Sequence, residues 1–218
     1  MLDVWLTDIL GYPVYNSLTP PDSDERSLTC AKVQVADVAT VNELTALGFR
    51  VVDVNVQLGA VGYAASSFYP SHAVWAEPSH HKALLKIAES CFSHSRFHRD
   101  VLTLPDANRI KREWLKNCLD GQRGLEVLIA LDKERPVGFL AVGQDGNFRT
   151  VDLLGVEPKS QDKGVGQRLL RNFKTLNPDR ILVAGTSLSN AAALRLYETQ
   201  GFRFRSASYV LHLHRGIQ

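Results

Sequence analysis

The stretch from Val151 to Phe173 constrains the fold of this chain more than any other part of the sequence. It begins with an apolar run, VDLLGV, that is typical of a buried strand, and Pro158 prevents this strand from continuing. A polar loop with Gly164 and Gly166 follows, and apolar residues then recur at helical spacing. The sequence therefore predicts a strand that leads through a glycine loop into a helix.

The glycine loop has the chemistry of a phosphate-binding site. The first turn of a helix leaves backbone N–H groups unpaired and carries the positive end of the helix dipole, so it attracts phosphate oxygens. Gly164 and Gly166 let a ligand approach the backbone closely, and Gln161 can donate from the loop entrance. Nearby side chains add positive potential: Lys159, Lys163, Arg168 and Arg171. The pattern favours a pyrophosphate, although a G-x-G sequence before a helix also occurs as an ordinary turn.

Comparison with known phosphate-binding motifs indicates which kind of ligand the loop would bind. The loop lacks the G-K-[ST] of a P-loop and the third glycine of a Rossmann fingerprint. From Val156 through Gln161 to Gly166 it resembles the acetyl-CoA-binding motif of the GNAT superfamily of N-acetyltransferases, V-x-P-x-x-Q-x-x-G-x-G. The resemblance implies acetyl-CoA as cofactor. It assigns cofactor binding to Leu154, Gly155, Val156, Gln161, Asp162, Lys163, Gly164, Val165, Gly166 and Asn190.

Composition narrows the class of protein. With 218 residues, 44% of them hydrophobic and 22% charged, the chain can bury one large core or two small ones. The net charge of +2 is too even a balance for a nucleic-acid or membrane surface, so we expect neither partner. No apolar run approaches the roughly 20 residues of a membrane span.

The cysteines and histidines bear on location and on metal binding. Cys30, Cys91 and Cys118 are widely separated, and the N-terminus lacks the basic start of a secretory signal. These features predict a reducing, cytoplasmic location. The seven histidines are scattered, so the sequence predicts no metal site.

Residues 1–70 are predicted to form a smaller N-terminal α/β domain. A strand at 30–36, a helix capped by Asp37 and ended by Gly48, and a second strand at 49–58 follow from the patterns there. The stretch LTALGFRVVDVNVQL resembles YETQGFRFRSASYVL near the C-terminus. The N-terminal domain is therefore either a partial copy of the second or a coincidence of common helix-to-strand junctions. Residues 59–71 suit a linker, with a boundary near residue 70.

Residues 71–218 are predicted to form the second, catalytic domain. From residue 79 the patterns give the order α-α-β-β-β-α-β-α-β, with an earlier strand around Ala73 to Ala76 and a loop from Ser93 to Asp100. This order is that of the GNAT fold. The predicted fold class is thus α/β (α+β), a GNAT acyl-CoA N-acyltransferase domain with a partial GNAT-like domain before it.

The resemblance also implies where the chemistry lies. In that fold, the strand before the loop and the strand from Ile181 splay apart, and N–H groups around Leu153 and Leu154 face the thioester carbonyl. The segment NAAALRLYETQGF resembles a pattern whose tyrosine protonates the departing CoA thiolate, which makes Tyr197 the general acid and Asn190 a cofactor contact. A buried core tyrosine is the alternative. Candidates for the base are Asp152, Glu126, His94 and His98, of which we select Asp152.

The acceptor is suggested by a second resemblance. CFSHSRFHRD at residues 91–100, together with stretches of the N-terminal region and the last helix, resembles the dTDP-fucosamine acetyltransferases, which acetylate the 4-amino group of a dTDP-linked 4-amino-4,6-dideoxyhexose. Candidate substrate-binding residues are Ser95, Arg96, Phe97 and Asp100. An arginine can pair with a diphosphate and a phenylalanine can stack on a base or sugar, but the same residues can cap a helix and fill the core.

Two other functions fit the same cofactor motif. The acceptor could be a different amine, such as a peptide N-terminus, a polyamine or an antibiotic, or the domain could bind acyl-CoA as a sensor without turnover. The predicted partner remains a small-molecule substrate, an amino-sugar nucleotide. Exposed edge strands at the C-terminus would also allow a homodimer.

Overall fold

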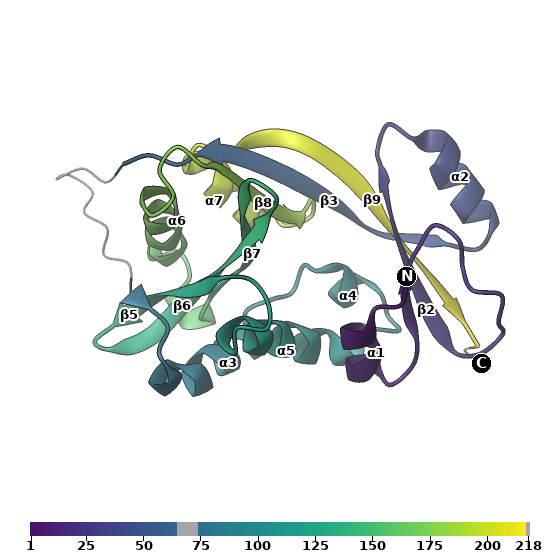
Figure 1. Cartoon of the computed structure of the whole chain (residues 1–218), viewed down its shortest axis with the longest axis horizontal. Coiled ribbons are helices and arrows are strands. Elements are labelled where there is room, and N and C mark those ends of the chain that lie inside the picture. The colour runs from purple at the N-terminus through teal and green to yellow at the C-terminus, as the bar shows by residue number, and fades with distance from the viewer. Residues whose placement is uncertain (65–73, 217–218) are drawn as a thin grey trace.

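The computed structural model describes residues 1–64 and 74–216. In these residues a single sheet of nine strands runs in the order β1-β2-β9-β3-β8-β7-β6-β5-β4 (Figure 1). Pairing is antiparallel except between β1 and β2 and between β7 and β8. The strands are β1 (Val14–Asn16), β2 (Ser27–Gln34), β3 (Arg50–Val61), β4 (Val74–Trp75), β5 (Glu126–Asp132), β6 (Arg135–Asp145), β7 (Phe148–Val156), β8 (Ile181–Ser187) and β9 (Arg203–Arg215).

Helices cover both faces of the sheet. α6 (Val165–Thr175) and α7 (Ala191–Thr199) lie on one face, and α3 (His81–Ser90) and α5 (Ala107–Leu119) on the other (Figure 1). Each face has its own apolar core, one around α6 and one between α3 and α5. The described part of the chain also has α1 (Val4–Leu10), α2 (Val38–Ala46), α4 (Arg96–Arg99) and 3-10 turns at Pro78–His80, Leu104–Asp106 and Pro158–Ser160.

The element order after residue 79 confirms the predicted mixed α/β fold class. The short strand expected around Ala73 to Ala76 corresponds to β4, whose Val74 and Trp75 pair with β5, while Ala73 lies outside the described residues. Residues 93–100 were expected to be a loop, which was wrong in part because they contain the helical turn α4. α7 begins after Asn190 and ends before Gly201, where the sequence places a capping residue and a terminating glycine.

The N-terminal strands share the sheet of the C-terminal half. β3 lies between β8 and β9, and β9 lies between β3 and β2. The two units β2-α2-β3 and β8-α7-β9 therefore interlock, with each strand of one unit paired to a strand of the other. The predicted boundary near residue 70 lies outside the described residues, so the division into 1–70 and 71–218 stays a prediction.

The sequence echo corresponds to a repeated local structure. α2 ends before Gly48 (φ 94°) and α7 before Gly201 (φ 80°), and in each case a buried phenylalanine, Phe49 or Phe202, precedes the strand. Glycine is needed at both positions because a left-handed backbone ends the helix. Placing β9 at an exposed edge was wrong, since it is hydrogen-bonded on both sides. The described edges of the sheet are β1 and β4.

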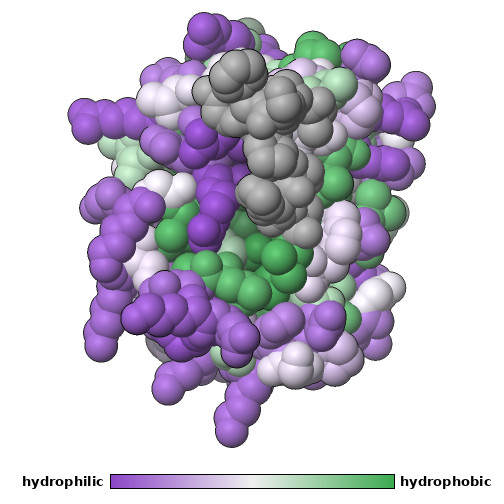
Figure 2. Space-filling model, turned by 90° about the vertical axis from the view of Figure 1, so that its left-hand side faces the viewer, coloured by the Kyte–Doolittle hydropathy of each residue, from purple (hydrophilic) through white to green (hydrophobic). Residues whose placement is uncertain are grey.

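The surface at one end of the molecule carries both hydrophobic and hydrophilic side chains. Figure 2 views the side that lies at the left of Figure 1, where hydrophobic surface gathers near the centre inside a border of hydrophilic side chains. No helix within residues 1–64 and 74–216 is long and apolar enough to cross a membrane.

Candidate active site

A cleft opens where β7 and β8 separate. The two strands pair at only three positions, Arg149 with Leu182, Thr150 with Val183 and Val151 with Ala184. Beyond Val151, β7 stays paired with β6 as far as Val156, and within the described residues no strand pairs with its other side. The resulting cavity of about 800 Å³ reaches from the glycine loop and α7 on one side to residues 91–97 and α5 on the other.

A β-bulge at Asp152 explains why the strands part at this point. Ala141 pairs with Leu153 and Val142 with Val151, so Asp152 is the extra residue on β7. A bulge bends its strand and increases the local twist, which turns β7 away from β8. Gly143 makes room for the bulge, because a Cβ there would lie 2.1 Å from the Asp152 Oδ1 atom.

The carboxylate of Asp152 lines the cleft but is already engaged. Its Oδ1 atom accepts a 2.8 Å hydrogen bond from the Thr150 hydroxyl, and its Oδ2 atom lies 3.5 Å from the Arg123 Nε atom. The structure thus brings Asp152 to the cleft with a cation beside it. A base there would act on an amine that approaches from the α5 side.

The open edge of β7 presents a free backbone donor. The Glu157 N–H donates to the Val137 carbonyl on β6. The backbone N–H and C=O groups of successive residues point to opposite edges of a strand, so those of Leu154 and Val156 point away from β6 and into the cleft. The Val156 carbonyl accepts a hydrogen bond from the Gln161 side chain at 3.2 Å. The Leu154 N–H has no protein acceptor in the described structure and is available to a ligand. Leu153 directs its N–H toward β6, so of the two expected oxyanion donors only Leu154 faces the cleft.

Gly155 has a packing role. A Cβ at this position would lie 2.6 Å from the Phe139 ring and 2.7 Å from the Cys91 Sγ atom. The glycine therefore lets the core beneath β7 close up. Burial raises the pKa of Cys91 to about 12, so the Cys91 thiol stays protonated near neutral pH.

The glycine loop turns sharply into α6 and leaves its backbone N–H groups unpaired in the described structure. Asp162 (φ 59°) and Gly164 (φ 77°) are both left-handed, and Gly164 is the N-cap of α6. The first helical bond joins the Arg168 N–H to the Gly164 carbonyl, and in the described structure the N–H groups of residues 162–166 have no protein partner. These donors lie at the mouth of the cleft, which Gln161, Asp162, Gly164, Val165 and Gly166 help to line; Lys163 lies between them in the loop.

Gly166 differs from Gly164 in what it accommodates. A Cβ on Gly166 would lie 2.9 Å from the Leu196 side chain of α7, whereas one on Gly164 would meet only the end of the Gln167 side chain at 3.9 Å. Gly166 therefore allows α6 and α7 to pack closely, and Gly164 leaves open space for a ligand. The close contact with α7 is a tertiary effect that the motif alone does not reveal.

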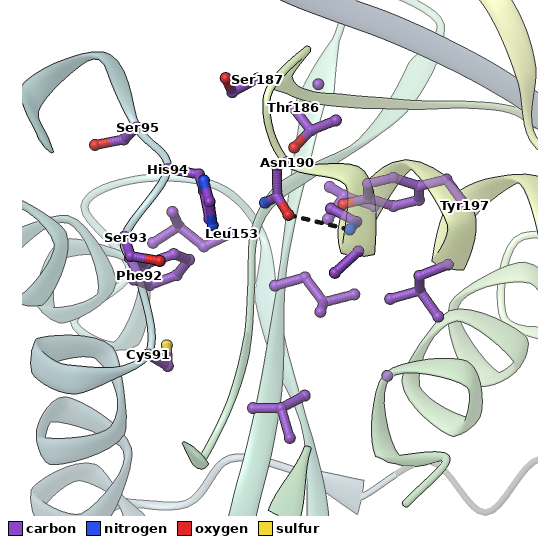
Figure 3. Close-up of a pocket in the computed structure, with 18 of the residues that line it drawn as sticks. Cys91, Phe92, Ser93, His94, Ser95, Leu153, Thr186, Ser187, Asn190 and Tyr197 are labelled. Atoms are coloured by element: carbon purple, nitrogen blue, oxygen red, sulfur yellow. Dashed lines mark hydrogen bonds between the residues drawn. The ribbon is translucent and has the colours of Figure 1, made fainter. Parts of the chain in front are cut away.

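α7 brings Asn190 and Tyr197 to the cleft. Asn190 caps the helix, its Oδ1 atom accepting from the Ala193 N–H at 3.1 Å. Tyr197 is 4% exposed, and its ring packs edge-on against Phe202. Its hydroxyl points from α7 toward the gap that faces β7, with no hydrogen-bond partner in the described structure (Figure 3). Burial raises the pKa of Tyr197, so the phenol remains protonated at neutral pH.

The opposite wall of the cleft is the turn at residues 91–97, which faces Asn190 across the gap (Figure 3). The Ser95 hydroxyl lies 2.7 Å from the His98 Nδ1 atom, which fixes the start of α4. Arg96 lines the cleft, with its guanidinium 4.6 Å from the centre of the Phe97 ring. Phe97 is only 2% exposed and belongs to the core of the N-terminal region, which favours a packing role over stacking on a substrate.

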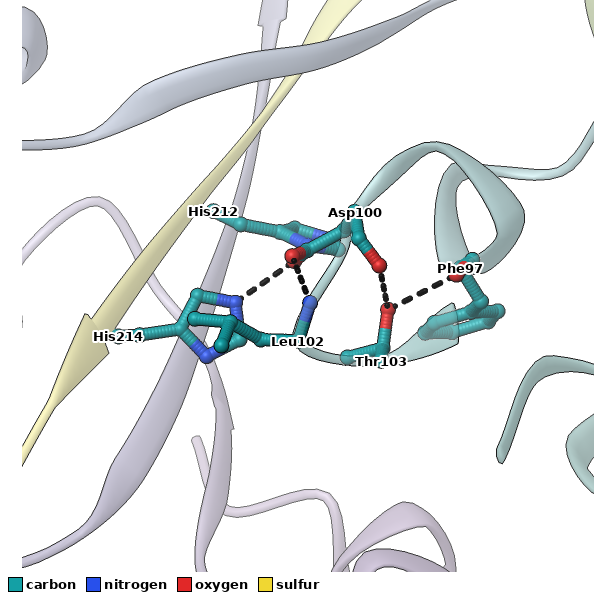
Figure 4. Close-up of polar contacts among 6 residues, drawn as sticks. All are labelled: Phe97, Asp100, Leu102, Thr103, His212 and His214. Carbon is teal, nitrogen blue, oxygen red and sulfur yellow. Dashed lines mark hydrogen bonds and ion pairs between the residues drawn. The ribbon is translucent and has the colours of Figure 1, made fainter. Parts of the chain in front are cut away.

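Asp100, expected to contact substrate, is placed elsewhere by the structure. It is buried outside the lining of the cleft, and its Oδ2 atom lies 2.6 Å from both the His212 Nδ1 and the His214 Nε2 atoms (Figure 4). Burial alone would raise the pKa of Asp100, but the hydrogen bonds from the two imidazoles and the Leu102 N–H outweigh it and lower the pKa. We call Asp100, His212 and His214 the anchor cluster, because it ties the end of α4 to β9.

The anchor cluster is the one group in the described residues with the spacing of metal ligands. Two ligands of a tetrahedral zinc ion lie about 3.3 Å apart when each is about 2 Å from the metal. The observed 2.6 Å contacts are those of charge-assisted hydrogen bonds instead. The arrangement is therefore explained without an ion.

Several cleft residues were missed by reading the sequence. Lys32, Asp53 and Asn55 reach the cleft from β2 and β3, and Lys111 and Trp114 reach it from α5. Lys111 and Trp114 are three residues apart, so they share a helix face, and this spacing was the available signal. For β2 and β3 no local signal existed, because their approach depends on the interlocked sheet.

Comparisons with known proteins agree with this geometry. Residues 123–204 match the family model described as acetyltransferase (GNAT) domain. The spore coat polysaccharide biosynthesis protein SpsD of Bacillus subtilis (strain 168) is 31% identical over 144 residues, which cover 64% of this chain and 50% of the relative. The chain thus spans about half of the length of that curated relative.

Solved structures share the fold. A GCN5-related N-acetyltransferase from Sphaerobacter thermophilus has a TM-score of 0.60 at 15% identity, with 89% of this chain and 62% of the other covered. A functionally unknown conserved protein from Staphylococcus epidermidis ATCC 12228 has a TM-score of 0.63 at 16% identity, with 88% and 73% covered. Residues 123–204 thus match the GNAT acetyltransferase domain family, and the described chain shares its fold with these solved structures.

Proposed function

We propose that this chain is an acetyl-CoA-dependent N-acetyltransferase that acetylates the 4-amino group of a dTDP-linked amino-deoxyhexose in surface polysaccharide biosynthesis. The observation that carries the proposal is the open edge of β7, with unpaired loop N–H groups on one side and a cation-lined wall on the other. The polysaccharide role named for the Bacillus relative supports a sugar acceptor.

The cofactor would lie along the α6 and α7 side of the cleft. Its diphosphate would accept hydrogen bonds from the N–H groups of residues 162–166. Its pantetheine amides would pair with the Leu154 carbonyl and the Val156 N–H on the free backbone edge of β7, which leaves the Leu154 N–H for the thioester. This path brings the thioester toward the hydroxyl of Tyr197.

The reaction would be a direct attack of the amine on the thioester. The amine nitrogen forms a bond to the acetyl carbonyl carbon, and the Leu154 N–H stabilises the oxyanion that develops. As the carbon–sulfur bond breaks, the Tyr197 hydroxyl donates its proton to the thiolate. Because burial raises the pKa of Tyr197 above that of a thiol, this transfer requires a short, pre-formed hydrogen bond from the hydroxyl to the sulfur. The nitrogen of the intermediate loses a proton to solvent as the amide forms, and the phenolate regains a proton from solvent.

The attacking amine must first lose a proton. Asp152 and His94 line the cleft, whereas Glu126 does not, and the two ring nitrogens of His98 contact Ser95 and Asn108. Asp152 remains our choice, because its carboxylate projects from the bulge that opens the cleft. A water bridge would carry the proton from amine to carboxylate.

The direct test is product formation with purified protein. Incubation with acetyl-CoA and a dTDP-linked 4-amino-4,6-dideoxyhexose should release free CoA thiol and an acetylated nucleotide sugar, measured by mass spectrometry. Tyr197→Phe should lower kcat about 10²-fold or more, with little change in acetyl-CoA affinity, because a phenyl ring keeps the packing and loses only the proton donor. Acetylation of a peptide or polyamine instead would assign another acceptor, and acetyl-CoA binding without turnover would indicate a sensor.

The cellular location follows from the same proposal. Cys30, Cys91 and Cys118 are all free thiols, which suits a reducing cytoplasm.

A further inference from the structure

Three cations meet on the wall of the cleft opposite the glycine loop. Lys32 comes from β2, Arg96 from the start of α4 and Lys111 from α5, and all three line the cavity. They are brought together from distant parts of the chain by the interlocked sheet and by α5.

None of the three forms an ion pair with a carboxylate within residues 1–64 and 74–216. The carboxylates nearby are used elsewhere: Asp53 accepts from the Ser187 hydroxyl at 2.6 Å, and Asp152 contacts Thr150 and Arg123. The Arg96 Nε atom is buried without a hydrogen-bond partner. Buried donors of this kind are normally satisfied, so the Arg96 Nε–H can donate to an acceptor on a bound ligand.

Aromatic rings hold two of these charges without neutralising them. The Lys111 ammonium lies 4.9 Å from the centre of the Trp114 ring and 5.3 Å from that of Phe92, and the Arg96 guanidinium lies over Phe97. Cation–π contacts fix the position of a cation and leave its charge available to an anion. Burial and the neighbouring Arg96 lower the pKa of Lys111 to about 8, and the same two causes lower that of Lys32.

We propose that Lys32, Arg96 and Lys111 form an anion subsite that binds the diphosphate of a nucleotide-linked acceptor. The three positive charges suit the two or three negative charges of a nucleoside diphosphate group, and a guanidinium can pair with phosphate bidentately. This inference rests on the proposed function for the identity of the second substrate. The cleft would then contain two phosphate sites. Backbone N–H groups would bind the cofactor's diphosphate, and side-chain cations would bind that of the acceptor.

The test uses thymidine 5′-diphosphate as probe, titrated by calorimetry into protein that is saturated with CoA so that the glycine loop is occupied. Lys111→Gln should weaken probe binding about tenfold or more, whereas Lys111→Arg should stay close to the wild-type value because the charge is kept. Lys116→Gln on the same helix is the matched control, since Lys116 lies outside the cleft and pairs with Asp120. Lys32→Gln on β2 is a second variant, and it leaves the apolar cores intact because Lys32 belongs to none of them.

A pH series adds a readout that a structural role would not change. The charged and titratable groups that face Lys111 are Arg96, Cys91, Arg123 and His98. Burial raises the pKa of Cys91 to about 12 and lowers that of His98, so Lys111 itself is the group expected to titrate near pH 8. Probe affinity should fall as the pH rises above about 8 in the wild type and fall less in Lys111→Arg.

Two results would overturn the subsite: unchanged probe affinity in both Lys111→Gln and Lys32→Gln, or equal affinity for thymidine and its diphosphate. If CoA itself fails to bind the wild-type protein, the proposed function fails instead. The same probe titration without CoA then decides the subsite on the same criteria.

Discussion

The two walls of the cleft differ in how each would hold a phosphate. On the α6 side the donors are backbone N–H groups of five consecutive residues, and their positions depend on two left-handed residues, Asp162 and Gly164. On the α5 side the donors are side chains from three separate elements, held by aromatic contacts and by the anchor cluster at the end of α4. The first site is therefore sensitive to local backbone conformation, and the second to tertiary packing.

The largest effect should come from Asp100→Asn, which disrupts the anchor cluster. This cluster holds the end of α4 on the α5 side of the cleft and does not contact the glycine loop. Replacing a buried carboxylate that accepts from His212 and His214 should lower the free energy of unfolding by about 2–3 kcal/mol, because charge-assisted hydrogen bonds are lost. Chemical denaturation measures this loss. Thymidine diphosphate affinity should fall more than acetyl-CoA affinity, since α4 carries Arg96. Equal losses for both ligands would contradict the separation of the two walls.

Acid should remove the same stabilisation. The pKa of Asp100 is lower in the folded than in the unfolded chain, so its contribution is full above about pH 4 and is lost as the pH falls further. Burial also lowers the pKa of His212, which adds a loss of stability that begins below about pH 6.5. The unfolding free energies of wild type and Asp100→Asn should converge at acid pH. Asp106→Asn, a partly exposed neighbour paired with Arg109, is the control and should cost under about 1 kcal/mol.

Gly164→Val should have the next largest effect, and it should act on the first site. A branched residue at φ 77° costs about 1–2 kcal/mol, and relief of this strain would turn the loop N–H groups away from the cofactor. Acetyl-CoA affinity, measured by calorimetry, should fall about tenfold or more. Gly146→Val is the matched control, because Gly146 is also left-handed (φ 54°) with open space around it, in the turn between β6 and β7. A similar loss of acetyl-CoA affinity in the control would attribute the effect to strain alone.

The sequence predicted the first wall better than the second for a physical reason. The strand, the proline, the two glycines and the helix that follow one another from Val151 to Phe173 determine the loop locally, and the same holds for the Asn190 cap and the Tyr197 helix. No such local pattern marks Lys32 or Lys111, because β2 reaches the cleft only through its pairing with β9. Arg96 and Phe97 on the α5 side of the cleft were predicted only through the resemblance to the dTDP-fucosamine acetyltransferases.

Tertiary contacts also changed the roles of predicted residues. Asp100 follows Arg96 by four residues in the sequence, yet His212 and His214 from the last strand hold it outside the cleft. The bulge at Asp152 depends on a register shift against β6 and on the missing side chain of Gly143. Neither effect can be inferred from periodicity, since both depend on which strands become neighbours.

The smallest effect should come from Gln161, whose side chain belongs to the first wall but supplements its backbone donors. The Gln161 amide donates to the Val156 carbonyl at 3.2 Å, and a single neutral hydrogen bond at an exposed position contributes about 0.5–1.5 kcal/mol at most. Gln161→Ala should therefore weaken acetyl-CoA binding only about threefold, as measured by calorimetry. Gln161→Glu should weaken it more, because the carboxylate cannot donate and repels the cofactor's phosphates. If the alanine variant lost as much affinity as Gly164→Val, side chains rather than backbone N–H groups would dominate recognition on the α6 side, and the contrast between the two walls would disappear.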